Sequence, residues 1–216
     1  MATISEPQPQ ARVAAGPSGS SMTGWAPANP APLGLFGFGM TTAVLSFVNA
    51  NIIGGGPTSY PIVLGMALAF GGVAQLLAGM WEFRTGNTFG AVAFSSFGAF
   101  WISFFILVSF NVAQLPAHEV NAGLGLYLLA WGAFTAMLFL CSFASPRALQ
   151  LLFLLLTATF VLLGIGNAGA HTTITHIGGY VGIATAAVAV YIATADLMKA
   201  AYGHSMLPLG EPAPRS

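Results

Sequence analysis

Three titratable side chains of this sequence could bind a proton at the edge of an apolar stretch. Glu82 ends one long stretch, and His171 and His176 flank the polar segment before another. A carboxylate within hydrocarbon costs about 2.5 to 3.5 kcal/mol on insertion scales, and histidine titrates near neutral pH. Glu82 is therefore expected to line an aqueous mouth or to exchange a proton. His171 and His176 are expected to relay protons or to serve only as polar residues where a helix starts.

The spacing of these groups indicates no metal centre and no catalytic motif. His176 follows His171 by five residues, which does not place both side chains on one helical face, and no cysteine or acidic residue lies nearby to complete a zinc site. His118-Glu119 lacks the second histidine of a zinc-protease motif. The polar segments of the chain are too short to hold a catalytic domain. We expect no metal, no cofactor and no enzymatic activity.

The elements that must hold these residues are six long apolar stretches. All ten charged side chains lie in the termini, between the stretches or at their ends. Hydrophobic residues make up 56% of the chain and charged residues 5%, whereas about 25% of residues are charged in soluble domains. Most stretches are close to the ~20 residues with which a helix crosses a bilayer. They cover residues 33–53, 60–81, 88–113, 124–143, 149–166 and 176–198.

The predicted fold is all-α, a polytopic membrane protein with six transmembrane helices. Membrane β-strands would alternate apolar and polar residues, whereas residues 151–156 are Leu-Leu-Phe-Leu-Leu-Leu. We expect residues 1–28 to form a flexible N-terminal tail, residues 29–202 the six-helix transmembrane domain and residues 203–216 a C-terminal tail. Cys141, the single cysteine, permits no internal disulfide and is expected to be a small buried residue.

The positive side chains predict the orientation of the chain in the membrane. With six spans, both tails and the second and fourth loops lie on one side, and they hold Arg12, Arg84, Arg147, Lys199 and Arg215. Positive loops tend to stay cytoplasmic, so both termini are expected on the cytoplasmic side of the cell membrane. Asp196 and Lys199 are expected to pair at that interface. The neutral net charge argues against a nucleic-acid partner.

The most distinctive string in the chain opens the first apolar stretch. It is Asn29-Pro30-Ala31-Pro32-Leu33-Gly34-Leu35, in which Asn29 suits a helix cap and Pro30 a first turn. The string resembles the signature of the acetate uptake transporter family, which includes the bacterial succinate and acetate permeases. Further blocks match in order between residues 29 and 211, and they are Phe36–Thr42, Gly71–Gln75, Ala78-Gly79, Glu82, Gly86–Gly90, Ser96–Gly98, Phe100-Trp101, Tyr127, Trp131-Gly132, Phe134-Thr135, Gly166-Asn167, His176 and Leu207–Glu211.

The resemblance implies a six-helix protomer that assembles into a membrane homohexamer, with a solute path inside each protomer. It implies acetate as the main solute, with succinate and other small carboxylates sometimes carried. In the family the path narrows at two aromatic side chains and a leucine, at positions that correspond here to Phe38, Phe97 and Leu156. Close relatives have tyrosine at the second position, so the constriction of this chain lacks one hydroxyl.

Such a constriction discourages hydrated ions by dewetting, so a carboxylate needs hydrogen-bond partners on either side or a proton. No lysine or arginine lies within a predicted span. A threonine in a membrane helix more often bonds to its own backbone, whereas Asn87 and Asn167, each beside a glycine in the matching blocks, are expected to face the path. The full set of candidate partners is Asn29, Thr41, Thr42, Gln75, Glu82, Asn87, Thr88, Asn167 and Thr173.

Two transport mechanisms fit these observations, a proton-coupled symporter and a passive anion channel for small monocarboxylates. A structural or sensory membrane protein is a further alternative, and it would need no water path at all. An uncharged path that binds weakly favours rapid release of a small monocarboxylate. We therefore predict an acetate permease with a hydrophobic constriction in each protomer, in contact with the lipid bilayer.

Overall fold

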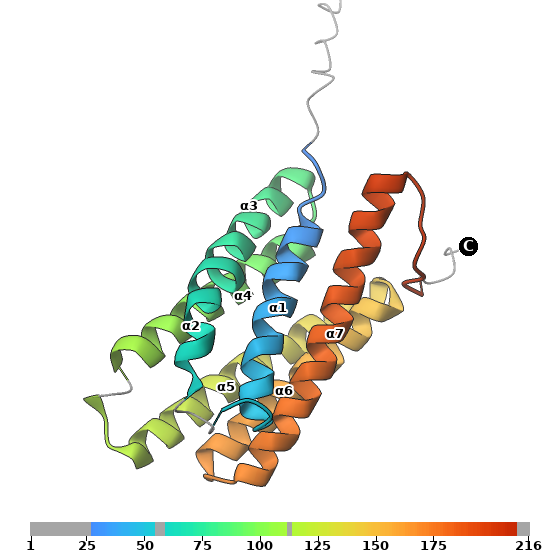
Figure 1. Cartoon of the computed structure of the whole chain (residues 1–216). Helices are drawn as coiled ribbons and strands as arrows, with labels where there is room; N and C mark the ends of the chain where they lie inside the picture. The colour runs from blue at the N-terminus through green and yellow to red at the C-terminus, as the bar shows by residue number, and fades with distance from the viewer. Residues whose placement is uncertain (1–26, 55–58, 112–113, 211–216) are drawn as a thin grey trace, which may run out of the picture.

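The computed structural model describes residues 27–54, 59–111 and 114–210 (Figure 1). The regular elements within these residues are all helical. Six of the resulting helices are long and apolar enough to cross a membrane, which confirms the predicted fold class. In chain order the elements are α1 (Ala31–Asn49), α2 (Pro61–Leu68), η2 (Ala69–Ala74), α3 (Gln75–Thr85), α4 (Thr88–Ile106), η3 (Leu107–Asn111), α5 (Ala117–Cys141), η5 (Ser142–Ala144), α6 (Arg147–Ala168) and α7 (Thr172–Tyr202).

Several helix boundaries differ from those that hydropathy predicts. The fourth crossing helix begins at Ala117 rather than at residue 124, and the sixth begins at Thr172 rather than at residue 176. Backbone hydrogen bonds continue a helix through polar first turns that hydropathy does not count. The first helix ends at Asn49 rather than at residue 53, and Asn51 has a φ of 57° that no α-helix contains. Most of the predicted N-terminal tail, residues 1–26, lies outside the described residues, as do residues 211–216.

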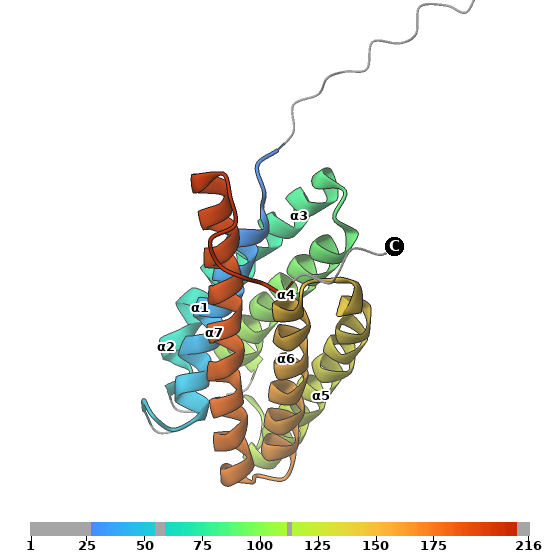
Figure 2. The same cartoon turned by 90° about the vertical axis from the view of Figure 1, so that its right-hand side faces the viewer.

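Several helices that are neighbours in the sequence pack against each other, and the last helix also packs against the first. α3 packs against α4, and α5 against α6, while α7 lies between α1 and α6 (Figures 1 and 2). Glycines of α7 make the contact with α1 close. A side chain at Gly179 would collide with the backbone of Ala50, and one at Gly182 would collide with Ser46. Small residues of this kind let membrane helices approach each other.

The outward faces of the bundle are covered by large apolar side chains. On α5 they include Leu126, Met137 and Leu140. Cys141 lies in the same strip and is exposed, so the expectation that it is buried was wrong. Residues three and four positions apart share one face of a helix, and Cys141 therefore follows Met137 to the outside.

A π-helical turn, η2, interrupts the second crossing helix where it meets α1. Gly71 of this turn packs on the side chain of Thr41, and Gly37 of α1 faces Phe70 and Gln75. π-turns are rare and frequently occur at functional sites. This one directs Gln75, the first residue of α3, toward the interior of the bundle, where its side chain is buried.

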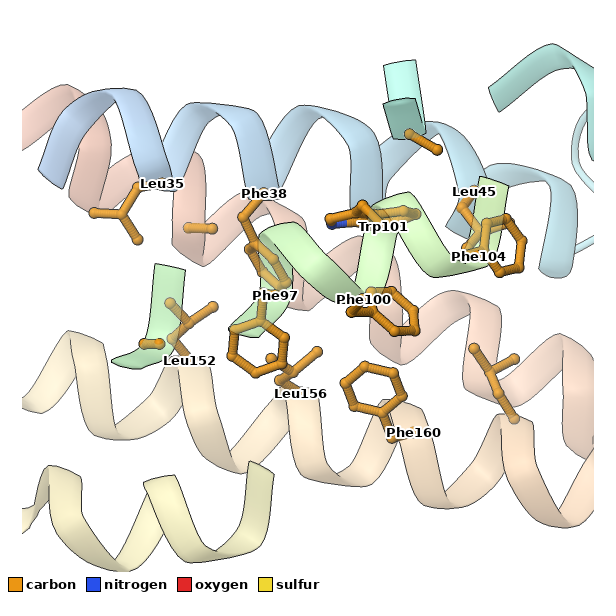
Figure 3. Close-up of a cluster of buried hydrophobic side chains, with 14 of the residues drawn as sticks. Leu35, Phe38, Leu45, Phe97, Phe100, Trp101, Phe104, Leu152, Leu156 and Phe160 are labelled. Carbon is orange, nitrogen blue, oxygen red and sulfur yellow. The ribbon is translucent and has the colours of Figure 1, made fainter. Parts of the chain in front are cut away.

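The buried core between α1, α4 and α6 is largely aromatic (Figure 3). α4 lies between the other two helices in this view, and its side chains point toward both. From α1, α4 and α6 in turn, the labelled members are Leu35, Phe38, Leu45, Phe97, Phe100, Trp101, Phe104, Leu152, Leu156 and Phe160. These three helices position the site described next.

Candidate functional site

The three side chains predicted to form a constriction lie together in the core. Phe38, Phe97 and Leu156 are each 4% exposed or less, and the ring centroids of Phe38 and Phe97 are 5.6 Å apart. All three line one cavity of about 230 Å³. They come from α1, α4 and α6, so an apolar ring closes between three helices (Figure 3).

Further aromatic rings surround Phe97. Its ring centroid lies 5.9 Å from that of Phe134 and 6.4 Å from those of Phe153 and Phe160. Phe153 and Phe160 were not among the candidate residues, and Phe134 belonged only to a block that resembles the family. The sequence pattern that could have indicated Phe160 is its spacing of four residues from Leu156, which itself follows Leu152 by four. This spacing places the three side chains on one face of the helix.

The cavity lies at the end of the bundle where α1, α4 and α6 begin and α7 ends. Ala31, Asn87, Ala148 and Asp196 mark that end on the cavity wall. The wall is mostly apolar, and its polar side chains are those of Gln75, Asn87 and Asp196. Helix N-termini carry a partial positive charge that favours a negative solute. Asp196, which the sequence analysis expected only in an interfacial ion pair, is therefore part of the cavity mouth.

Glu82 and Asn87 are joined across the short turn between α3 and α4. Asn87 Nδ2 donates a hydrogen bond of 2.9 Å to Glu82 Oε2, which also accepts from Thr85 Oγ1 at 3.1 Å. Asn87 Oδ1 accepts from the backbone N–H of Gly90 and so caps α4. Glu82 is 2% exposed and lies behind the part of the wall that Asn87 and Gly90 form. The carboxylate thereby fixes the amide that faces the cavity.

Several buried polar atoms have no hydrogen-bond partner among the described residues. They are Thr41 Oγ1, Thr42 Oγ1, Gln75 Oε1 and Glu82 Oε1, together with two on α4. An unpaired buried polar group costs about 1–3 kcal/mol, so such atoms mark places that water or a polar solute would occupy. Gln75 is the one of these four that also lines the cavity.

Four exposed candidate residues line neither the cavity beside Phe97 nor the one that contains His176. Asn29 is exposed, and its Oδ1 accepts from the N–H of Ala31 at the start of α1, as its sequence context predicted for a cap. Thr88 is exposed in the first turn of α4. His171 and Thr173 are exposed at the α6–α7 turn, where His171 occupies the N-cap position of α7. The geometry brings none of them to the aromatic ring.

A second cavity, of about 190 Å³, lies at the opposite end of the bundle and contains Asn167 and His176. Asn49, Tyr60 and Asn121, which the sequence analysis did not select, share its wall. Tyr60 donates to Asn49 Oδ1 over 3.2 Å. Burial raises the pKa of Tyr60 to about 12, so its hydroxyl stays a neutral donor at physiological pH. Asn167 also donates to the carbonyl of Leu163 within α6, so one of its two amide hydrogens has a structural use.

Buried and mostly apolar side chains separate the two cavities, and Thr159 of α6, hydrogen-bonded to Thr185, is among them. On α6 the first cavity ends at Leu156 and the second begins at Gly166, a separation of about 15 Å at the helical rise of 1.5 Å per residue. Phe160 and Leu163 are buried between them. The buried interval between the cavities is therefore longer than the three-residue constriction that the family resemblance implies.

The described part of the chain contains no cluster of potential metal ligands. Among residues 27–54, 59–111 and 114–210, no group of three or more His, Cys, Asp or Glu side chains could hold an ion. His118 and Glu119 are exposed at the start of α5, with 3.9 Å between Nε2 and Oε1. What the geometry offers instead is two cavities, each with a few polar side chains in its wall, and buried side chains between them.

Comparison with known proteins identifies close relatives. The GPR1/FUN34/yaaH family matches residues 15–209. The chain is 39% identical over 184 residues to the succinate-acetate/proton symporter SatP of Escherichia coli K12, a match that covers 85% of this chain and 96% of that protein. It is 40% identical over 198 residues to acetate permease A of Emericella nidulans, covering 84% of this chain and 65% of the permease.

A solved structure shows the same fold. The structure of the bacterial acetate channel SatP superposes with a TM-score of 0.78 at 38% sequence identity, covering 85% of this chain and 99% of that one. The similarity in fold therefore extends over most of this chain.

Proposed function

The chain belongs to the GPR1/FUN34/yaaH family and transports acetate, and we propose that acetate crosses each protomer between the two cavities described above. The relatives are a symporter, a permease and a channel, so the protein is a transporter rather than an enzyme. The observation that carries the proposed path is the position of Phe38, Phe97 and Leu156, which close the inner end of a cavity whose mouth is polar.

The proposed path has a binding region at each end and a barrier between them. Gln75 and Asn87 supply hydrogen bonds to the carboxylate in the first cavity, and Asn167 and His176 supply them in the second. Neither cavity wall contains a lysine or arginine, so binding is weak enough to permit release on the far side. Thr41 and Thr42 lie on α1 next to the barrier. Their buried hydroxyl oxygens have no hydrogen-bond partner among the described residues and could bind water or the solute there.

We propose proton-coupled transport, with Glu82 as the proton-binding group. A bare carboxylate must shed its hydration to cross a buried and mostly apolar interval of this length, whereas acetic acid carries no charge. Glu82 Oε1 is buried without a hydrogen-bond partner among the described residues, behind the amide that faces the solute. It offers a place for a proton beside the first cavity. The E. coli relative is described as a proton symporter and the solved relative as a channel.

Labelled-acetate flux into proteoliposomes tests both the solute and the mechanism. The purified protein is compared with empty liposomes, with and without an inward proton gradient and with the voltage set by potassium and valinomycin. Accumulation against the acetate gradient only when protons flow inward supports the symporter. Flux that merely equilibrates and follows the voltage overturns proton coupling in favour of a channel. Flux no greater than in empty liposomes contradicts acetate transport.

The assembly we propose is a homohexamer with a path in each protomer. The exposed apolar faces of α3 and α5, which carry Leu77, Trp81, Met137 and Leu140, supply surface for neighbouring copies as well as for lipid. Native mass spectrometry of the protein in detergent gives the number of copies directly. A monomer under conditions that preserve acetate binding would count against the hexamer.

The chain is a multi-pass membrane protein, and we propose the cytoplasmic membrane as its location, with both termini in the cytoplasm. On this orientation the cavity with Asn87 and Asp196 opens to the cytoplasm, and the cavity with His176 opens to the outside. The proposed transport domain is residues 29–202, flanked by the two tails. A reporter active only in the cytoplasm, fused after residue 216, tests this orientation, because an inactive fusion in the membrane fraction would reverse it.

A further inference from the structure

The chain after α7 folds back onto the bundle and reaches the mouth of the first cavity. Figure 2 shows this segment, in dark red, crossing from the end of α7 toward the start of α6. Gly203, with a φ of 78°, ends α7 in the left-handed conformation that favours glycine and lets the chain reverse. Leu209, six residues further on, lines the cavity together with Ala148 and Asp196.

Three hydrogen bonds hold the segment in place. The N–H groups of Arg147 and Ala148, at the exposed N-terminus of α6, donate to the carbonyls of Gly210 and Leu209 over 2.9 and 3.0 Å. Tyr191 of α7 donates its hydroxyl to the carbonyl of Pro208 over 2.8 Å. The first turn of a helix has N–H groups without partners inside the helix. Here two carbonyl groups of the tail accept hydrogen bonds from two of those N–H groups.

The tail is held mainly by these hydrogen bonds, whereas the helices of the bundle are held by apolar packing. The segment is irregular, and its two leucines, Leu207 and Leu209, are both half-buried. Of these two, Leu209 packs against the hydrophobic core. We propose that residues Leu207–Gly210 form a lid over the first cavity, and that the Leu209 side chain sets the width of its mouth. The lid must open for a carboxylate to pass this end of the path. The role in solute passage rests on the proposed transport function.

A readout independent of transport tests whether the lid opens. The single cysteine is removed as Cys141→Ser, and Leu149→Cys places a thiol on the cavity wall, where Leu149 is half-buried. Its reaction rate with a water-soluble maleimide measures how often the mouth is open. Leu209→Ala is expected to raise the rate about tenfold, which corresponds to about 1.4 kcal/mol. The matched control is Leu207→Ala, in the same segment but not on the cavity wall, and it leaves the rate unchanged.

A second variant keeps every tail side chain. Tyr191→Phe removes only the hydroxyl that holds Pro208 and is expected to raise the labelling rate about two- to tenfold, the range of one net hydrogen bond. A chain truncated after His204 is expected to label fastest. Equal labelling rates in the parent, Leu209→Ala and Tyr191→Phe proteins would overturn the lid.

Flux measurements on the same variants link the lid to the solute. In proteoliposomes Leu209→Ala is expected to raise butyrate flux relative to acetate flux, and Leu207→Ala is expected to leave the ratio unchanged. Faster labelling with an unchanged flux ratio would overturn Leu209 as the residue that sets the mouth width. The parent protein separates this result from a failure of the proposed function, because absent acetate flux in the parent contradicts transport while the labelling rates still decide the lid.

Discussion

Asn87 Nδ2 donates a 2.9 Å hydrogen bond to Glu82 Oε2, and this bond joins the end of one transmembrane helix to the start of the next. The same asparagine caps α4 through its Oδ1 and faces the first cavity. A structural role and a place on the proposed solute path therefore meet in one side chain. Substitutions at either residue must separate the two roles.

Removing the charge of Glu82 should abolish proton coupling without breaking the local structure. In Glu82→Gln an amide oxygen remains to accept from Asn87 and Thr85, so the turn keeps its hydrogen bonds. Accumulation of acetate driven by a proton gradient is expected to disappear, while exchange of labelled for unlabelled acetate continues. Glu119→Gln is the control, because Glu119 is exposed at the opposite end of the bundle. Undiminished accumulation in Glu82→Gln would exclude Glu82 as the coupling group.

Asn87→Leu should lose both the cap and the amide in the cavity. Loss of a cap destabilises a protein by about 0.5–2 kcal/mol, so the melting temperature in detergent should fall, and acetate flux should fall with it. Asn87→Ser is the matched comparison, because serine still caps a helix but does not reach Glu82 or the solute. Asn87→Ser is expected to reduce flux with a smaller loss of stability than Asn87→Leu, because only the hydrogen bond to Glu82 is lost. Normal flux in both variants would leave Asn87 with a packing role alone.

Phe38→Ala should widen the constriction. Removal of a buried phenyl group costs about 3–5 kcal/mol of folding stability, and it opens space beside Phe97, whose ring centroid is 5.6 Å from that of Phe38. Flux of propionate and butyrate should rise relative to acetate flux. Met40→Ala on the exposed face of α1 controls for general weakening of the helix. An unchanged selectivity ratio in folded Phe38→Ala protein would argue against a constriction at this position.

The cost of ionising the buried Tyr60 hydroxyl should make the protein less stable at high pH. Its pKa is raised from 10.0 to about 12 by burial, so the unfolded chain loses this proton first as the pH rises. Stability from this group is thus complete below about pH 10 and falls between pH 10 and 12, by about 3 kcal/mol. Urea unfolding in detergent at pH 9 and 11 measures the fall. It should shrink in Tyr60→Phe but persist in Tyr202→Phe, which alters an exposed ring, and an equal fall in all three proteins would contradict this assignment.

The buried interval between the cavities shows where prediction from the family resemblance ended. The resemblance identified Phe38, Phe97 and Leu156, and the structure places them together. It gave no indication that Phe160 and Leu163 continue the barrier along α6 toward the second cavity. Leucine and phenylalanine occur on every face of these helices, so their identity alone does not distinguish barrier residues from those that contact lipid.

The sequence by itself determined the helices. Backbone groups within hydrocarbon must bond inside their own segment, so uninterrupted runs such as residues 149–166 could only be helical, and polar breaks such as Gly86-Asn87 had to separate them. The tertiary structure alone decided which faces turn inward. Apolar side chains surround each helix, and no amphipathic pattern marks the inner face. Only packing could therefore bring Asp196 and Leu209, near the end of the chain, to a cavity formed by Ala31 and Asn87 from its first half.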